Sequence, residues 1–158
     1  MERNFTIYFT SDLHGYIYPT DYRSRKERDI GLFKCANRFE KDGNTLVIDG
    51  GDLLQGSPLG AFCHDTLGDA GRFAQIMNRC GYDYVTLGNH DFNYGKEELE
   101  KYISALDARC LCANIAGIRG VENTAIVTLQ NGLRVGLTGV TTHYVKLWEK
   151  PENLDGIT

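Results

Sequence analysis

The sequence predicts an α/β fold, and three observations support this class. Short β-rich runs alternate with helical patterns, several runs end in glycine and acidic residues, and Asn-Gly joins the last two runs. Alternating strands and helices are typical of a largely parallel sheet flanked by helices. At 158 residues the chain has the size of a single domain and is long enough to bury a core. We find no repeat or linker and expect one domain, or one part of a domain.

Composition and periodicity place the expected elements along the chain. Strands are expected where β-branched and aromatic residues gather, or where a short apolar run lies between turns. Helices are expected where apolar residues recur three or four positions apart, as Leu32, Cys35, Ala36 and Phe39 do. In chain order the predicted elements are a strand at 5–10, a helix at 30–41, a strand at 45–48, a helix from Asp69 or Gly71 to Cys80, a strand at 84–87, a helix at 96–106, a strand at 111–113 and strands at 124–129 and 133–140.

The last two strands are predicted to pair as a hairpin. Asn131-Gly132 lies between them, and these residue types tolerate the positive φ angles of a tight two-residue turn.

Composition and charge narrow the class of protein. The hydrophobic fraction of 42% and the charged fraction of 24% are typical of a globular protein. The formal net charge of -4 argues against a nucleic-acid polymer or a membrane as partner, because both favour a basic face. Five scattered cysteines do not indicate a disulfide framework and fit a reducing compartment. Without an apolar leader run we expect a cytoplasmic location, or an exported or cell-surface one if a leader has been removed.

Small polar clusters follow three of the predicted strands. They are Asp12-Leu-His14, Gly50-Gly51-Asp52 and Gly88-Asn89-His90-Asp91. Each cluster alone is compatible with an ordinary turn, because Asp, Asn and Gly favour turns. In open α/β sheets, however, functional groups gather outside the carboxyl ends of the strands. Three such clusters in succession therefore predict a site at this end of the sheet.

The residue types in these clusters indicate a metal site. Mixed Asp, His and Asn ligands suit borderline divalent ions such as Mn, Fe, Co, Ni or Zn. A calcium site would use oxygen ligands only, and a structural zinc site would favour cysteine. A carboxylate such as Asp52 can bridge two ions, and the neighbouring glycines allow the backbone to turn sharply and approach a metal or phosphate.

The ordered motifs resemble those of the calcineurin-like metallophosphoesterases. Asp12-Leu-His14, Gly51-Asp52 and Gly88-Asn89-His90-Asp91 match the first three motifs of that family. The longer strings from Gly51 to Leu59 and from Gly88 to Gly95 are similar to the branch of 5′-nucleotidases and 2′,3′-cyclic-nucleotide phosphodiesterases, and more closely to the phosphodiesterases. The resemblance runs from Thr6 to about Thr142, which is nearly the whole chain.

The resemblance implies a role for each motif residue. Asp12, His14 and Asp52 would bind one divalent metal ion, and Asp52 and Asn89 would bind a second. His90 would lie near the phosphate as a proton donor or as a stabiliser of the leaving oxygen, oriented by Asp91. A water activated between two ions becomes a hydroxide near neutral pH and attacks phosphorus. The implied activity is hydrolysis of nucleotide phosphoesters, most closely that of a 2′,3′-cyclic-nucleotide phosphodiesterase, with a 5′-nucleotidase as the alternative.

The resemblance also implies that the chain is incomplete. The family adds one isolated histidine, a Gly-His-x-His motif and a nucleotide-binding domain further along the chain, and residues 1–158 contain none of these. We therefore expect the N-terminal portion of a catalytic domain in a four-layer α/β/β/α sandwich. A second hypothesis is a truncated fragment that binds at most one metal and is catalytically inactive. An incomplete sandwich would leave apolar sheet surface uncovered, which favours self-association.

Overall fold

A computed structural model of the chain describes residues 3–24 and 26–158. Its centre is a five-stranded parallel sheet in the order β1-β2-β3-β4-β5, so the α/β prediction with a largely parallel sheet is confirmed. The five strands are β1 (Thr6–Thr10), β2 (Thr45–Asp49), β3 (Tyr84–Val85), β4 (Arg109–Leu111) and β5 (Val121–Glu122).

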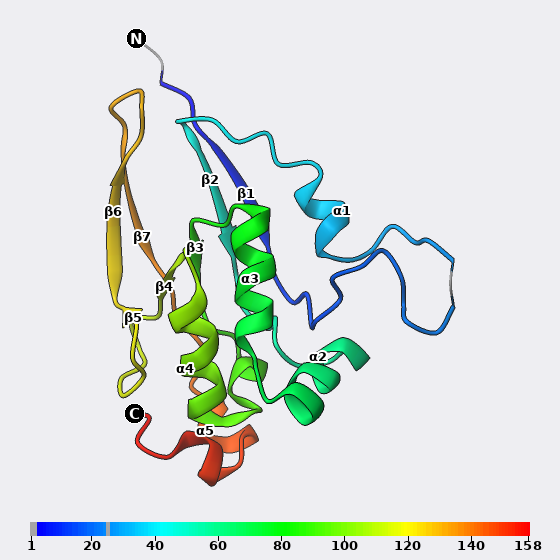
Figure 1. The fold of residues 1–158 in the computed structure, drawn as a ribbon. Helices are drawn as coiled ribbons and strands as arrows, with labels where there is room; N and C mark the ends of the chain where they lie inside the picture. Colours follow the sequence, from blue (N-terminus) through cyan, green and yellow to red (C-terminus); the bar gives the residue numbers. More distant parts are fainter. Residues whose placement is uncertain (1–2, 25) are drawn as a thin grey trace.

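Helices connect these strands, and α3 and α4 lie side by side against the sheet (Figure 1). The amphipathic pattern of α3 buries Phe73, Ala74 and Met77, and Gly81 ends this helix in the left-handed conformation. The helical elements are α1 (Leu32–Ala36), α2 (Pro58–Phe62), a π-helical turn η1 (Cys63–Leu67), α3 (Gly71–Cys80), a 3-10 turn η2 (Asn89–Phe92), α4 (Gly95–Ala105), α5 (Val145–Trp148) and a 3-10 turn η3 (Pro151–Leu154).

The two faces of the sheet pack against different layers. Strand side chains alternate between faces, so Val47 and Val85 join the core under the helices, whereas Leu46 and Tyr84 face the other way. That second face packs on a separate hairpin of β6 (Thr124–Thr128) and β7 (Arg134–Thr138). The chain thus forms three layers, a helical layer, a parallel sheet and an antiparallel hairpin (Figure 1).

The hairpin prediction is confirmed, but its turn differs from the expected two-residue form. Thr128 pairs with Arg134, and Leu129 N–H donates to the carbonyl of Leu133 at 2.8 Å. Gly132 has a φ of 79°, whereas Asn131 is not in the positive-φ region. The loop is therefore a three-residue connection in which glycine alone takes the left-handed position.

Two other sequence-based expectations are corrected by the structure, and two further segments were not anticipated. The helix expected at 30–41 is α-helical only over Leu32–Ala36, because Arg38 and Phe39 donate to carbonyls three residues back and tighten the chain. The strand expected at 111–113 lies at Arg109–Leu111, two positions earlier. Strand β5 and the helical segment from Pro58 to Leu67 were not anticipated, although Ser57 before Pro58 is a typical helix start.

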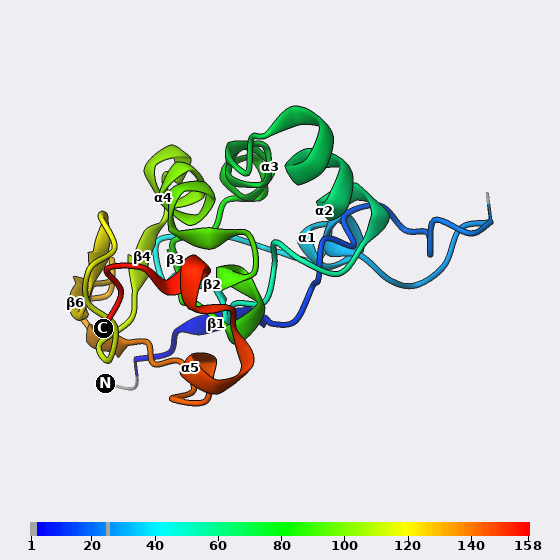
Figure 2. The same ribbon diagram turned by 90° about the horizontal axis from the view of Figure 1, so that it is seen from below.

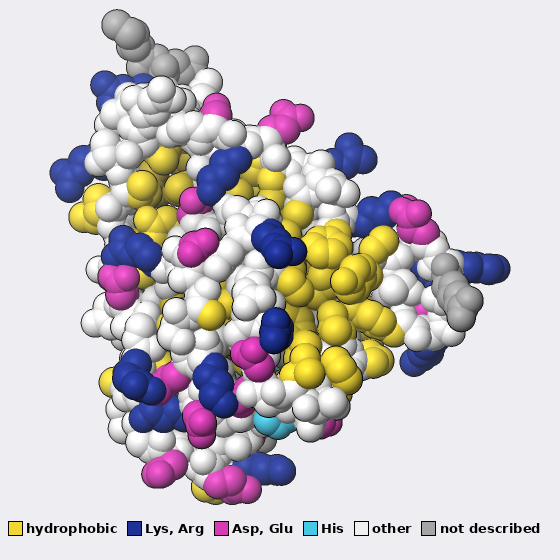
Figure 3. Space-filling model, viewed as in Figure 1, with side chains coloured by type: hydrophobic (Ala, Val, Ile, Leu, Met, Phe, Trp, Pro, Cys, Tyr) yellow, Lys and Arg dark blue, Asp and Glu magenta, His cyan; other side chains and the backbone are white. Residues whose placement is uncertain are grey.

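The parallel strands all finish at one end of the sheet, where the sequence predicts that the polar clusters after β1, β2 and β3 meet. Figure 2 views the molecule from this end and shows α5 and the C-terminal segment lying across it. Elsewhere, hydrophobic side chains reach the surface between α1 and α3, where Phe33, Ala36, Phe39 and Cys80 line a hollow (Figure 3). Among the described residues no helix has the length and apolarity needed to span a bilayer, and the expected compartment stays a prediction.

Candidate metal centre

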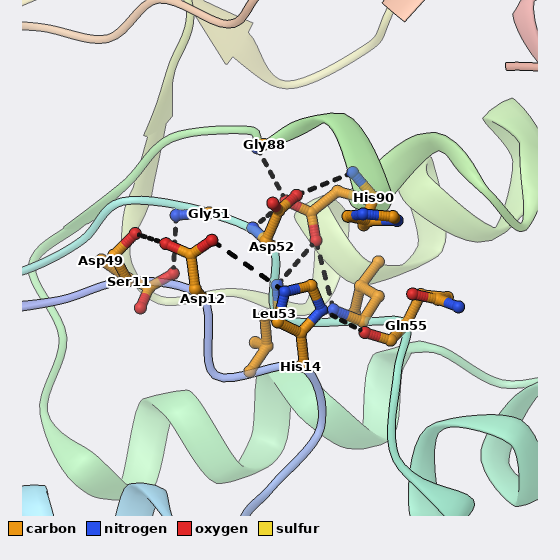
Figure 4. Close-up of polar contacts among 12 residues, drawn as sticks. Ser11, Asp12, His14, Asp49, Gly51, Asp52, Leu53, Gln55, Gly88 and His90 are labelled. Carbon is orange, nitrogen blue, oxygen red and sulfur yellow. Dashed lines mark hydrogen bonds and ion pairs between the residues drawn. The ribbon is translucent and has the colours of Figure 1, made fainter. Parts of the chain in front are cut away.

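Asp12, His14 and Asp52 come together at the carboxyl ends of β1 and β2. Each offers one ligand atom, and these atoms all lie within 4.8 Å of one another. Figure 4 shows the three side chains turned toward a common point. Backbone hydrogen bonds fix the two loops, since Asp12 N–H donates to the Gly51 carbonyl at 3.0 Å and His14 N–H donates to the Asp52 carbonyl at 2.8 Å.

The backbone at these three residues is in an uncommon conformation. Asp12, His14 and Asp52 have φ angles of 55°, 47° and 57°. Among the described residues Tyr22 is the only other non-glycine residue with a positive φ. Left-handed backbone costs energy for residues with a side chain, and it is concentrated at functional sites. The fold thus holds all three side chains in orientations that ordinary turns would not give.

Two glycines allow the loops after β2 and β3 to approach each other. A Cβ on Gly51 would lie 2.2 Å from the backbone nitrogen of Gly88, and Gly51 has a φ of 93°. A Cβ on Gly88 would lie 2.2 Å from Oδ1 of Asp52. Both positions therefore require glycine for steric reasons, as the sequence led us to expect.

The ring of His14 is oriented by the segment that follows Asp52. His14 Nδ1 lies 2.8 Å from the backbone carbonyl oxygen of Gln55. A carbonyl only accepts hydrogen bonds, so Nδ1 carries the proton and Nε2 presents its lone pair. Ser57 also supports this loop, because its hydroxyl donates to the carbonyl of Gly15 at 2.7 Å. The Gln55–Ser57 segment thus holds His14 in a metal-binding tautomer.

Asp91 is buried and binds backbone rather than the histidine next to it. Its carboxylate accepts hydrogen bonds from the N–H groups of Asp52, Leu53, Leu54 and Gly88, at 2.8 to 3.2 Å. The expectation that Asp91 orients the His90 ring is therefore wrong. Gly88 is the N-cap residue before the η2 turn and Asp91 is the third residue of that turn, so the bond from Gly88 N–H to Asp91 is a local capping arrangement. Asp91 links the loop after β3 to the loop after β2.

His90 is oriented by Asn93 instead. His90 Nδ1 lies 2.8 Å from Oδ1 of Asn93, and Asn93 in turn donates to the carboxylate of Glu149. The His90 and His14 rings are 5.2 Å apart between centroids, in an edge-to-face arrangement. The spacing of three residues between His90 and Asn93 on a helical turn was a signal for this contact. No sequence pattern indicated Glu149, which lies 56 residues further along.

Asn89 and the two other histidines of the chain, His64 and His143, take different positions. Asn89 begins the η2 turn next to His90 and so lies at the same end of the sheet as the ligand cluster. His143 is exposed and His64 stacks on Tyr94, with ring centroids 4.0 Å apart. Neither histidine belongs to the cluster of Asp12, His14 and Asp52.

Two buried carboxyl groups, Asp49 and Asp91, lie behind the site, and burial favours their uncharged forms. Burial raises the pKa of Asp49 to about 7, against the opposing hydrogen bonds from Thr10 and Gly51. Burial likewise raises the pKa of Asp91, and the backbone N–H groups act in the opposite direction. The donors that would attract a cation are therefore the carboxylates of Asp12 and Asp52 in the ligand cluster, rather than the two buried groups behind it.

The residues present fit a divalent metal ion. Two carboxylates and one imidazole supply the mixed oxygen and nitrogen donors that borderline divalent ions prefer. The lone pair on His14 Nε2 is available, and the hydrogen bond from Nδ1 to Gln55 is the kind of outer contact that metal-binding histidines make. The prediction that Asp12, His14 and Asp52 share one site agrees with this geometry.

Comparison with known proteins points to the same family by sequence model and by individual relatives. A sequence model of the calcineurin-like phosphoesterase family matches residues 5–157. The chain is 33% identical, over 96% of its length, to the trifunctional nucleotide phosphoesterase protein YfkN of Bacillus subtilis, of which it covers 12%. It is 29% identical, over 93% of its length, to a 2′,3′-cyclic-nucleotide 2′-phosphodiesterase/3′-nucleotidase of Yersinia enterocolitica, of which it covers 26%. The chain thus spans only a small part of these relatives.

Solved structures with the same fold are also found. The crystal structure of the calcineurin-like phosphoesterase YfkN superposes with a TM-score of 0.78 at 31% identity, over 95% of this chain and 52% of that one. A Staphylococcus aureus protein described as a 5′-nucleotidase superposes with a TM-score of 0.85 at 32% identity, over 96% of this chain and 31% of that one. The fold predicted from the motifs is therefore confirmed.

Proposed function

The chain belongs to the calcineurin-like phosphoesterase family, and from this premise we propose that it hydrolyses phosphate esters of nucleotides with the help of divalent metal ions. The observation that carries the proposal is the cluster of Asp12, His14 and Asp52, in which all three residues have a left-handed backbone conformation. A phosphoesterase needs positive charge next to a phosphate, and a cluster of this donor chemistry is suited to hold it.

Each side chain of the centre has a proposed role. Asp12, His14 and Asp52 would hold one ion, and Asp52 with Asn89 would contribute to a second. Bound ions would supply positive charge that offsets the charge developing on the phosphate, and they would lower the pKa of a bound water. His90 would donate a proton to the leaving oxygen or stabilise it, and its ring is positioned 2.8 Å from Asn93. Asp91 would serve as the buried support that holds the His90 turn against Asp52.

For the substrate we propose a 2′,3′-cyclic nucleotide, with 5′-nucleoside monophosphates as the alternative. The strings Gly51–Leu59 and Gly88–Gly95 support the first, since they are more similar to the cyclic phosphodiesterases. Relatives of similar identity carry either name, including a 5′-nucleotidase of Vibrio cholerae at 30% identity. Parallel assays on 2′,3′-cyclic AMP and 5′-AMP decide between the two substrates.

We further propose that residues 1–158 are the N-terminal portion of the catalytic domain, and that residues outside them complete the second metal site. The support is the small share of the relatives that the chain covers, 12% and 26%. If the 158-residue chain acts alone, it would bind one ion tightly and show little turnover. Fusing it to the remainder of its natural polypeptide would then raise the rate. An equal rate per molecule with and without the remainder would contradict this division.

The catalytic proposal is tested with bis(p-nitrophenyl) phosphate and added manganese. We expect hydrolysis by the natural polypeptide and its loss in Asp52→Ala and His90→Ala, because one removes a metal ligand and the other a proposed proton donor. His143→Ala is the matched control, since His143 is exposed and lies outside the ligand cluster. Hydrolysis that is unchanged after Asp52→Ala would overturn the proposal.

A further inference from the structure

Glu149 lies directly after α5 and holds a network of hydrogen bonds next to the site. One carboxylate oxygen, Oε1, accepts from the backbone N–H of Lys150 at 2.7 Å and from the side-chain amide of Asn153 at 2.8 Å. The other oxygen, Oε2, accepts from the side-chain amide of Asn93. Asn153 also donates to the backbone carbonyl of Asn93 at 2.9 Å, so two contacts tie this segment to the His90 turn.

The ionic state of Glu149 fits this arrangement. Burial alone raises the pKa of a carboxyl group, but the hydrogen bonds donated by Lys150, Asn153 and Asn93 outweigh it and lower the pKa of Glu149. Glu149 is therefore a carboxylate at neutral pH, and a carboxylate only accepts hydrogen bonds.

The chemistry of these groups fixes the orientation of the Asn93 amide. Because Glu149 can only accept, the nitrogen of the Asn93 side chain must face it. The amide oxygen of Asn93 then faces Nδ1 of His90, at 2.8 Å. An oxygen acceptor at this distance requires that Nδ1 carry the proton, which leaves Nε2 without one in the neutral ring. Among the described residues, Nε2 of His90 has no hydrogen-bond partner.

We propose that Glu149 is a positioning residue for His90, which fixes the amide of Asn93 and thereby selects the tautomer in which Nε2 is free to contact substrate. This inference rests on the proposed catalytic role of His90 and extends it to a residue on a different segment. Glu149 acts through Asn93, because its hydrogen-bond partners are Asn93, Lys150 and Asn153 and not the His90 ring.

The test is the tautomer of His90, read from the 15N chemical shifts of its ring nitrogens at a pH where the ring is neutral. The natural sequence is expected to show the proton on Nδ1. In Glu149→Gln the donors from Lys150 and Asn153 keep the amide oxygen at the Oε1 position, so the new NH2 group faces Asn93. Asn93 must then rotate and present its own NH2 to His90. We expect the proton to move to Nε2, which interchanges the two nitrogen shifts.

A second variant separates this effect from a loss of folding. The second variant is the double substitution Asn93→Asp with Glu149→Gln. The carboxylate at position 93 can then accept two hydrogen bonds, one from His90 Nδ1 and one from the NH2 group at position 149. We expect it to restore the proton to Nδ1, and thermal unfolding of each variant confirms that the fold is intact. Glu152→Gln is the matched control, because Glu152 is exposed in the neighbouring turn; it should leave the shifts unchanged.

Two results would overturn the inference. One is a natural protein with the proton on Nε2, and the other is a folded Glu149→Gln variant in which the His90 shifts do not move. The measurement uses no substrate and no metal, so a failure to find phosphoesterase activity would not affect it. Conversely, an unchanged tautomer would leave the proposed hydrolysis intact.

Discussion

Asp91 and Asp52 support each other across the gap between two strand ends. The Asp91 carboxylate accepts from the backbone N–H of Asp52 at 2.8 Å, and the Asp52 carboxylate accepts from the backbone N–H of His90 at 2.7 Å. The reciprocal bonds hold a proposed metal ligand and a proposed catalytic histidine at a fixed separation. The geometry of the site therefore depends on one buried carboxylate that need not touch substrate or metal.

Replacing Asp91 should destabilise the protein. In Asp91→Asn an NH2 group replaces one oxygen and faces two backbone N–H donors, which lose their acceptor. We expect a loss of about 3 kcal/mol in the free energy of unfolding, measured by urea denaturation. Asp65→Asn serves as the control, because the Asp65 side chain is 71% exposed. Equal losses in the two variants would show that the Asp91 bonds do not hold the loops.

Asp49 should make stability depend on pH. Burial raises its pKa to about 7 from a usual value of 3.8. Between these values the folded chain binds a proton that the unfolded chain does not. The free energy of unfolding therefore falls as pH rises through this window, by at most about 1.4 kcal/mol per pH unit.

The variant Asp49→Asn removes this contribution. Its amide oxygen can accept from Gly51 and its nitrogen can donate to Thr10, so both contacts of Asp49 can be kept. Urea denaturation at pH 5, 6, 7 and 8 without added metal should show that the free energy of unfolding of Asp49→Asn falls less steeply with pH. Above pH 7 the variant should be more stable than the natural sequence. The exposed control Asp107→Asn should keep the natural slope. A natural protein whose stability rises with pH across this window, with the same slope in Asp49→Asn, would count against the assignment.

Self-association is expected through the face of the sheet that the hairpin does not fully cover. On β1, Ile7 and Phe9 are exposed by 44% and 64%, and with Leu137 and Val140 they line a hollow between the two sheets. Burying Phe9 in a contact between copies is worth about 1.5 kcal/mol or more. Phe9→Ser should therefore weaken association of the 158-residue chain roughly tenfold, as measured by light scattering over a concentration series.

The control for Phe9→Ser is Phe62→Ser, on helix α2 and away from this face. It should leave association unchanged. A natural chain that stays monomeric at all concentrations would contradict the expectation, as would equal effects of the two substitutions.

The sequence was sufficient for the fold class and for the centre of the site. Apolar runs such as residues 45–48 predict buried strands, and the polar residues that follow each run, among them Asp12 and Asp52, lie together because parallel strands end at one edge. These signals are local, since they depend on residue type and on spacing along the chain.

The contacts that orient the site were not predictable in the same way. Asp91 was expected to hold the neighbouring ring but binds backbone 37 to 39 residues away, because the close approach of Gly51 and Gly88 puts those N–H groups within reach. The bond between Asn93 and Glu149 depends on how α5 crosses the end of the sheet, a tertiary feature that no local pattern encodes. Helix α1 likewise ends earlier than its periodicity predicts, and Phe39 beyond its end packs on Tyr8 and Tyr82, which are distant in the sequence.

The central claim, that Asp12, His14 and Asp52 form a metal centre, is tested most directly by titrating manganese into the protein in a calorimeter. The variant is Asp52→Asn, whose amide oxygen can still accept from His90 and so preserve the fold. We predict that the natural sequence binds manganese and that Asp52→Asn binds it at least about tenfold more weakly, while the exposed control Asp107→Asn binds as the natural sequence does. Equal manganese affinity in the natural protein and in folded Asp52→Asn would contradict the claim.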